Sequence, residues 1–424
     1  MRTDGPVLTA EEQALLAGEG GAGVARALRV VVAAARFLDA PRLVAVSSAH
    51  VDGCLYHGDG GVEYAERLVR EGARVRVPTT LNVGALDLLH PERVRADPHA
   101  TRMSARLMEA HVTLGCTPTW TCAPYQAGHR PAVGSQVAWG ESNAVAFVNS
   151  VLGARTNRYG DFLDVACAIS GRAPWSGLHT DEGRLATLLV ELGHLPADLR
   201  AADVFYPVLG SWLGRHAGGR VAALDGLPLP VSEDRLKALG AAAASTGAVG
   251  LFHVIGATPE APDVATAFGG RAPTAVLRPS RSELARTLST LSSTERTRLD
   301  AVAVGSPHFS LDEFSDLEAL LPERPFAVPF YVCTGRGVLE RLETEGRLRR
   351  FEDAGIRLVA DTCVVVAPIL DAAGGTLMTN SGKFAHYTPG TTGYDVVFGS
   401  LEECVRSARE GRVRRDAALW GAAE

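Results

Sequence analysis

Three cysteines stand in settings that suit a metal centre. Cys122 lies in an irregular polar and aromatic loop, Pro118 to Tyr125. Cys363 lies just inside an apolar run that we predict as a strand, and Cys333 ends another such run, before a turn-forming Thr-Gly-Arg-Gly sequence. Strand ends of α/β sheets are where sites form, and soft thiolates select iron–sulfur clusters or zinc. The alternative for each cysteine is a small buried hydrophobe.

The other four cysteines divide into two pairs. Cys167, in the Asp164-Val165-Ala166-Cys167 sequence, and Cys404, on a predicted amphipathic helix, are interpreted as buried hydrophobes. Cys54 and Cys116 fall in polar loops and are candidates to line a pocket. No C-x-x-C pair exists, which disfavours a zinc ribbon or a thioredoxin-type site.

Polar side chains follow two predicted strands of the first third of the chain. Ser48 and His50 come directly after a predicted strand at 43–46, and Thr79, Thr80 and Asn82 come after one at 75–77. We expect both groups at the same edge of one parallel sheet, where they would bring hydroxyls, an imidazole and an amide together.

Two further polar groups occur later in the chain. The first flanks an apolar stretch, and its arginine suits bidentate binding of a substrate carboxylate: Ser142, Asn143, Arg155, Thr156 and Asn157. The second, with Ser381 and Lys383, follows a predicted strand. Each of these side chains, taken singly, is explained as well by a cap, a turn or an ion pair.

Two apparent nucleotide-binding motifs fail on their context. Gly18 to Gly23 matches G-x-G-x-x-G, but a predicted helix precedes it where a strand is required. Gly382-Lys383 resembles the end of a phosphate-binding loop, but Leu377 replaces the required glycine and Phe384 the magnesium-binding hydroxyl. No G-x-S-x-G nucleophile motif is present.

The elements that must position these residues follow an α/β rhythm. We predict helices near 10–17, 24–38, 62–71, 236–244, 339–354 and 401–410. Further strands are predicted at 249–255, 301–304, 327–332 and 358–366. Alternation of strands and helices predicts mostly parallel sheets. The segment 111–180 is less periodic and is predicted to form loops that carry a site.

Composition limits the class of protein. The 424 residues carry a net charge of -6, which argues against nucleic acid or an anionic membrane as the main partner. Seven cysteines without an apparent export signal or membrane span predict a cytoplasmic protein. The basic residues include only two lysines, Lys237 and Lys383, which makes each of them informative.

Several long, ordered stretches of the chain resemble the aconitase X family. The resemblance runs from about Leu8 to Glu403 and is carried by VSSAHVDGCLYHG, VPTTLN, PTWTCAPYQ, WGESNAVAFVNSVLGARTNRYG, GLHTDEGR, PHFSLDEF, ADTCVVVAPILD and TNSGKFAHYTPG. It implies a dehydratase of the aconitase superfamily, built of α/β layers in several domains. We expect these domains at 1–198, 199–297 and 298–424.

The resemblance also implies a cofactor and a partner. The cofactor would be a [2Fe-2S] or [4Fe-4S] cluster, or mononuclear iron, on Cys122, Cys363 and a third ligand. Archaeal relatives carry a cysteine where this chain has Ser306, so Cys333 is the substitute and Cys116 the alternative. No stretch resembles the small swivel domain of the family, so a separate small subunit is expected.

The implied reaction removes water from a small hydroxy acid. Details around Trp120 and 157–160 are similar to the bacterial branch, which converts cis-3-hydroxy-L-proline to Δ1-pyrroline-2-carboxylate; the archaeal branch acts on mevalonate 5-phosphate. An iron ion would draw off the hydroxyl as a Lewis acid. Lys383 would stabilise the enediolate-like intermediate or bind the substrate carboxylate. His50 would act as general acid or support a ligand, and Ser48 would help to orient substrate. A metal-free binding subunit and a nucleotide-linked oxidoreductase are the competing hypotheses.

Overall fold

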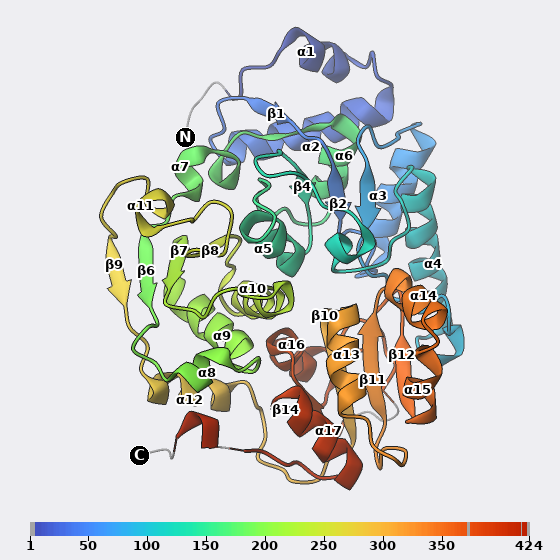
Figure 1. Ribbon diagram of the computed structural model, residues 1–424. Coiled ribbons are helices and arrows are strands. Elements are labelled where there is room, and N and C mark those ends of the chain that lie inside the picture. Colours follow the sequence, from blue (N-terminus) through green and yellow to red (C-terminus); the bar gives the residue numbers. More distant parts are fainter. Residues whose placement is uncertain (1–4, 371–373, 417, 422–424) are drawn as a thin grey trace. The chain divides into compact units, whose positions relative to one another are not determined.

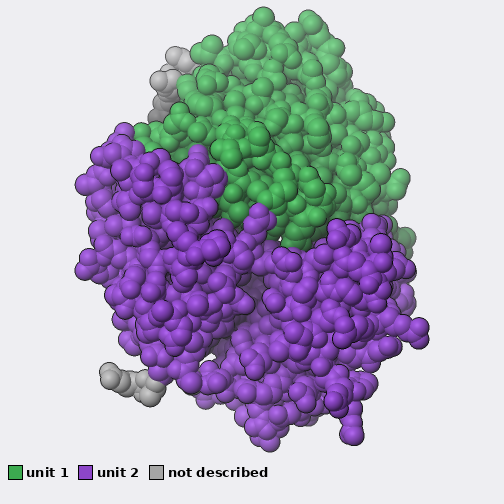
Figure 2. Space-filling view, viewed as in Figure 1, with its two compact units in different colours: residues 1–86, 96–185 green, residues 87–95, 186–424 purple. Residues whose placement is uncertain are grey.

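The structure, a computed structural model, describes residues 5–370, 374–416 and 418–421 (Figure 1). Asp371, the last residue of the ADTCVVVAPILD stretch, lies outside these ranges. The described residues form two compact units: unit 1 holds 5–86 and 96–185, and unit 2 holds 87–95 and the residues from 186 onward (Figure 2). No helix within these ranges is long and apolar enough to cross a membrane.

Unit 1 combines helices with two small sheets. Its main helices are α1 (Ala10–Ala17), α2 (Ala22–Phe37), α3 (Asp59–Arg70), α4 (Pro98–Thr113), α5 (Ser142–Ser150), α6 (Leu163–Ser170) and α7 (Asp181–Arg184), and its single-turn helices are η2 (Pro124–Ala127) and η3 (Gly177–His179). Its strands are β1 (Leu43–Ala45), β2 (Ala49–Val51), β3 (Thr79–Leu81), β4 (Ala138–Trp139) and β5 (Arg172–Pro174). The predicted capping box at Thr9 and Glu12 is confirmed, and Gly18 and Gly21 form the predicted turn between α1 and α2.

The strand assignments of unit 1 need correction. The prediction of a strand at 75–77 was wrong: β3 lies at Thr79–Leu81 and pairs in parallel with β2, which in turn pairs with β4. The predicted strand at 43–46 is present as β1, but it pairs antiparallel with β5 in a separate sheet. His50 and Thr80 therefore lie within neighbouring strands: threonine favours strands, and ladder partners on both sides of β2 hold His50 in the sheet.

The segment 111–180 is more regular than predicted. It contains α5 and α6, and every residue from Asn143 to Ser150 is buried, as is every residue from Asp164 to Ser170. A helix that is buried on all sides shows no amphipathic period, which is why the sequence pattern missed both.

Unit 2 contains two fully parallel sheets. The first has the order β8-β7-β6-β9, with β6 (Leu188–Glu191), β7 (Ala222–Asp225), β8 (Phe252–Val254) and β9 (Ala275–Leu277). The second has the order β12-β11-β10-β13-β14, with β10 (Ala301–Phe309), β11 (Phe330–Thr334), β12 (Ile356–Val359), β13 (Thr376–Thr379) and β14 (Asp395–Phe398). The predicted α/β class with mostly parallel sheets is confirmed.

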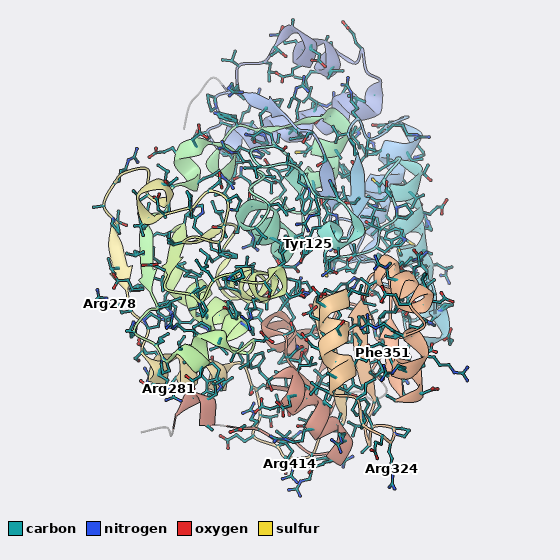
Figure 3. All side chains as sticks on the ribbon, viewed as in Figure 1. Tyr125, Arg278, Arg281, Arg324, Phe351 and Arg414 are labelled. Carbon is teal, nitrogen blue, oxygen red and sulfur yellow. The ribbon has the colours of Figure 1, made fainter. Side chains whose placement is uncertain are left out.

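The helices of unit 2 connect these strands. They are α8 (Ala197–Ala201), α9 (Phe205–Ala217), α10 (Glu233–Gly247), α11 (Val264–Ala267), α12 (Arg281–Thr290), α13 (Leu311–Ala319), α14 (Arg336–Thr344), α15 (Leu348–Asp353), α16 (Gly382–Thr392) and α17 (Leu401–Glu410), with single turns η1 (Pro91–Arg93) and η4 (Ala418–Trp420). Phe351 of α15, labelled in Figure 3, is fully buried and packs edge-on against Phe314 of α13.

Two predicted elements of unit 2 have different bounds. The single helix predicted at 339–354 is two helices, α14 and α15, separated near Gly346, which has a φ of +69°. The strand predicted at 358–366 ends at Val359, and Asp361 follows with a φ of +61°. A left-handed residue cannot continue a strand, so Cys363 lies in the turn beyond β12 and not inside a strand as predicted.

Candidate functional site

The parallel sheet of unit 1 aligns two candidate side chains, His50 and Thr80, with Trp139. His50 of β2 lies opposite Thr80 of β3 on one side and opposite Trp139 of β4 on the other. Side chains at matching register positions of neighbouring strands emerge close together. His50 and Thr80 therefore meet inside the sheet, and the prediction that His50, Thr79 and Thr80 follow their strands at its edge was wrong.

Thr80 joins two histidines. Its hydroxyl Oγ1 lies 2.8 Å from Nδ1 of His50 and 2.8 Å from Nδ1 of His129. Burial, followed by the influence of His129, lowers the pKa of His50 well below its usual range, and burial lowers the pKa of His129 to about 4. Both rings are therefore neutral at pH 7. His129 was missed in the sequence, although it closely follows the PTWTCAPYQ stretch.

Ser48 directly precedes β2, and Thr79 is the first residue of β3. The backbone carbonyl of Ser48 accepts from Ala138, while its buried hydroxyl has no hydrogen-bond partner among the described residues. The Thr79 hydroxyl donates to the Val77 carbonyl at 2.8 Å. The predicted role of Ser48 in substrate orientation stays a prediction.

A carboxylate pair adjoins the end of β2. The Asp52 backbone N–H donates to Oδ2 of Asp164 at 2.6 Å, and the Asn82 amide donates to the Asp52 carboxyl. Burial, then the charge of Glu141, raises the pKa of Asp52 to about 8. Burial raises the pKa of Asp164 to about 7. Carboxyls that stay partly protonated at neutral pH are typical of sites that move protons.

Cys122 is buried in the loop that precedes η2. Its carbonyl accepts a hydrogen bond of 2.8 Å from the side-chain amide of Asn143, in the first turn of α5. In the same region Tyr125, labelled in Figure 3, stacks on Phe147 with ring centroids 3.6 Å apart. The motif loop is therefore anchored on a buried helix, which holds Cys122 in a defined position.

The remaining candidates of unit 1 make contacts with the scaffold. Arg155 pairs with the exposed Asp181 at 2.5 Å. The Thr156 hydroxyl accepts from the Trp139 backbone, and the Asn157 amide donates to the Ser176 carbonyl. The Ser142 hydroxyl lies 3.4 Å from the Glu141 carboxylate. Their predicted substrate contacts stay predictions.

Unit 2 gathers its candidates at the carboxyl end of the five-stranded sheet. Ser381 caps α16 by accepting from the Phe384 N–H at 3.0 Å, and its hydroxyl donates to the Ser306 carbonyl of β10. Lys383 follows strand β13, as predicted, and lies in the first turn of α16, a helix that the sequence did not predict. Cys333 is fully buried in β11, next to Gly305 of β10.

The turn that carries Cys363 is held by an ion pair. Asp361 accepts two hydrogen bonds of 2.6 Å from the guanidinium of Arg336, at the start of α14. His308 of β10 contributes a third contact, with its Nε2 3.2 Å from the Thr362 carbonyl. These contacts join β10, the start of α14 and the turn after β12, close to Cys333 and Cys363 in the sequence.

The predicted metal ligands are divided between the units. Cys122 belongs to unit 1, whereas Cys333 and Cys363 belong to unit 2. Their thiolate chemistry suits iron. Considering the described residues alone, no group of three or more His, Cys, Asp or Glu side chains is placed to hold a metal ion. The three-cysteine centre, with Cys116 as the alternative ligand, stays a prediction.

Comparisons with known proteins identify the class. Family models of the aconitase X first, second and third domains match residues 6–182, 186–289 and 299–410. The crystal structure of aconitase X from Thermococcus kodakaraensis, in its holo-form, superposes with a TM-score of 0.85 at 33% identity, over 95% of this chain and 100% of that one. The chain belongs to the aconitase X family.

Two named relatives narrow the class further. The chain is 44% identical to cis-3-hydroxy-L-proline dehydratase of Pseudomonas aeruginosa, over 98% of this chain and 72% of the relative. It is 37% identical to the phosphomevalonate dehydratase large subunit of Methanothermobacter thermautotrophicus, over 93% of this chain and 97% of the relative. Both relatives are dehydratases, so the predicted class, a hydro-lyase, is confirmed.

Proposed function

We propose that the protein is the large subunit of an iron-dependent hydro-lyase that dehydrates cis-3-hydroxy-L-proline to Δ1-pyrroline-2-carboxylate. The observation that carries this proposal is the 44% identity with the Pseudomonas enzyme over almost the whole of this chain. The reaction removes the proton alpha to the carboxylate and the hydroxyl at the neighbouring carbon, and the two leave together as water.

The residues of this chain supply several of the groups that such a reaction needs. Ser48 and Thr80 offer hydroxyls that orient the substrate, and Arg155 offers a guanidinium for its carboxylate. Lys383, in the first turn of α16, brings a positive charge that stabilises negative charge developing on the substrate carboxylate. His50, neutral and buried, is suited to exchange a proton.

The proposal includes iron held by Cys122, Cys363 and either Cys333 or Cys116. When bound, iron supplies a Lewis acid for departure of the hydroxyl group. The support for iron is the thiolate chemistry of these residues together with family membership.

The proposal also includes a small partner subunit and a cytoplasmic location. Archaeal relatives that match this chain over nearly their full length are named large subunits. All seven cysteines are buried and none forms a disulfide, which suits a reducing compartment. The domain bounds 1–198, 199–297 and 298–424 stay predictions.

The direct test is a dehydration assay on protein purified without oxygen. Formation of Δ1-pyrroline-2-carboxylate from cis-3-hydroxy-L-proline, together with bound iron, is the expected result. The second candidate substrate is mevalonate 5-phosphate, favoured by the archaeal relatives. Turnover of that substrate alone would replace the first proposal, and turnover of neither, with the partner subunit present, would contradict both.

A further inference from the structure

Three side chains of unit 1 form a continuous hydrogen-bonded row. Nδ1 of His50, Oγ1 of Thr80 and Nδ1 of His129 are linked by two contacts of 2.8 Å each. Thr80 stands between the rings, and Trp139 flanks both, with ring centroids 5.5 Å from His50 and 4.9 Å from His129. The proposed function uses His50 and Thr80 but assigns nothing to His129.

A count of hydrogens constrains this row. A threonine hydroxyl has one hydrogen to donate, and each neutral imidazole carries one N–H. Both contacts are satisfied when Thr80 donates to Nδ1 of one histidine and accepts from Nδ1–H of the other. We propose that His50, Thr80 and His129 form a tautomer-coupled proton relay, in which one histidine always exposes a bare Nε2 and the other an Nε2–H.

The surroundings of the rings support a relay over a purely structural pair. Nε2 of His50, Nε2 of His129 and Nε1 of Trp139 are all buried, and none has a hydrogen-bond partner among the described residues. Buried polar atoms without partners are rare, because each costs the free energy of its lost hydration. Two such imidazole nitrogens beside the Trp139 indole, whose own nitrogen is the third, point to a polar ligand that completes their hydrogen bonds.

Neutral rings are a condition of the coupling. A cationic imidazole donates from both nitrogens, and two such donors would leave the Thr80 hydrogen without an acceptor. Burial lowers the pKa of both histidines, so each ring carries a single N–H at pH 7. The condition is met.

The relay supplies both proton transfers of the dehydration, one from carbon and one to the leaving hydroxyl. This role of the relay rests on the proposed function. A proton taken up at the bare Nε2 moves the Nδ1 proton of that ring to Thr80, the Thr80 proton to Nδ1 of the second ring, and the Nε2 proton of the second ring out. Uptake of one proton is balanced by release of another. The row therefore removes the proton at carbon and returns one to the leaving hydroxyl without gaining charge. His50 and His129 are the two rings that exchange protons with the substrate, and Thr80 is the positioning residue between them.

The first test reads the tautomers directly. Protein labelled with ¹⁵N-histidine is studied by NMR at pH 7, and His50→Gln and His129→Gln variants assign the two rings. The expected result is one Nδ1–H ring and one Nε2–H ring. Thr80→Val should abolish this pairing, and Thr80→Ser should preserve it. Two rings in the same tautomer, a cationic ring, or an unchanged Thr80→Val spectrum would overturn the relay.

The second test uses kinetics with the partner subunit present. Thr80→Val and His129→Gln should each lower kcat about 10²-fold, and His129→Gln should leave KM nearly unchanged. Thr80→Ser should restore most of kcat, and Thr101→Val, which removes a surface hydroxyl of α4, is the matched control. Equal kcat for Thr80→Val and wild type would overturn the relay. A wild-type protein that dehydrates neither substrate would instead contradict the proposed function, while the NMR result would still decide the relay.

Discussion

At the scale of the residue, burial alone does not distinguish the seven cysteines. Their exposed fractions run only from 0% to 7%. What differs is position: Cys122 and Cys363 lie in turns beside polar residues, whereas Cys404 lies in the apolar face of α17. Position in a turn allows a thiolate to face a ligand, and position on a packed helix does not.

Loss of a thiolate ligand should show in the iron content. Cys122→Ser and Cys363→Ser proteins, purified without oxygen, should lose most of their bound iron and their visible absorbance together. Cys404→Ser, which alters a buried cysteine of α17, should keep both. Iron retained in full by the Cys122→Ser and Cys363→Ser proteins would exclude these residues as ligands.

Lys237 illustrates a buried charge used for stability. Its ammonium lies 2.7 Å from Asp234 and 2.5 Å from Glu313, and its side chain is 2% exposed. Lys237→Met leaves these carboxyls without a counter-charge, and should lower the free energy of unfolding by about 3 kcal/mol. Urea denaturation measures this loss. Arg341→Met, which breaks the exposed Arg341–Glu345 pair, should cost less than about 1 kcal/mol.

The carboxyl of Asp52 should make stability depend on pH. Its pKa is raised to about 8, whereas the pKa of an aspartate in an unfolded chain is about 3.9. The folded state therefore binds the extra proton, and the stability that this carboxyl contributes is complete below about pH 4 and lost as the pH rises to 8.

The Asp52→Asn variant tests whether the stability contributed by Asp52 falls as the pH rises. The variant should gain stability relative to wild type when urea denaturation is repeated from pH 5 to pH 8. Asp59→Asn is the control: the pKa of Asp59 is lowered by its hydrogen bond to Tyr56, so its effect should be constant over this range. A stability difference between Asp52→Asn and wild type that does not change with pH would contradict the assignment.

At the scale of the element, the ends of parallel strands carry the candidates of unit 2. β10, β11 and β13 end at Phe309, Thr334 and Thr379, and the last residues of these strands, with the residues after them, form the candidate edge. Gly305 makes this edge possible: its φ is +92°, and a Cβ there would lie 2.1 Å from the Cys333 carbonyl oxygen. Only glycine permits that approach of β10 to β11.

Gly305→Ala should therefore disrupt this edge of the sheet. The free energy of unfolding should fall by more than about 2 kcal/mol, since the new methyl group forces β10 and β11 apart. Gly337→Ala is the control, because a Cβ there meets no atom within 4 Å and alanine favours helix α14; it should raise stability by up to about 1 kcal/mol. Equal stability of the two variants would show that the strands can adjust.

At the scale of the whole molecule, the family assignment bears on whether this chain acts with a separate small subunit. The three family domains account for most of the chain, and the chain spans 72% of the Pseudomonas relative but 97% of the archaeal large subunit. The region of the Pseudomonas relative that this chain does not match can be tested as a partner of this chain.

That region, expressed as a separate polypeptide, should raise the activity of this chain. We expect kcat for cis-3-hydroxy-L-proline to increase at least about 10-fold when it is added in excess, because it would complete the active site. Serum albumin at the same concentration is the control. Full activity of the chain by itself, with no response to the added polypeptide, would contradict the need for a partner.

Sequence by itself determined the class of the molecule and its repeating elements. The capping box of α1, the apolar strands β10 and β11 and the helices α10 and α17 were all predicted, since their signals are local. The ordered motifs also predicted the family. Local patterning and long motifs survive in a sequence because each depends on neighbouring residues.

Only the tertiary structure decided which side chains meet. β2, β3 and β4 have two or three residues each and exist because strands from distant segments pair with one another. The contact of His129 with Thr80 joins residues 49 positions apart, which no local pattern encodes. The all-buried helices α5 and α6 lack the period that reveals surface helices. Packing, and not propensity, therefore placed the histidine–threonine row at the centre of unit 1.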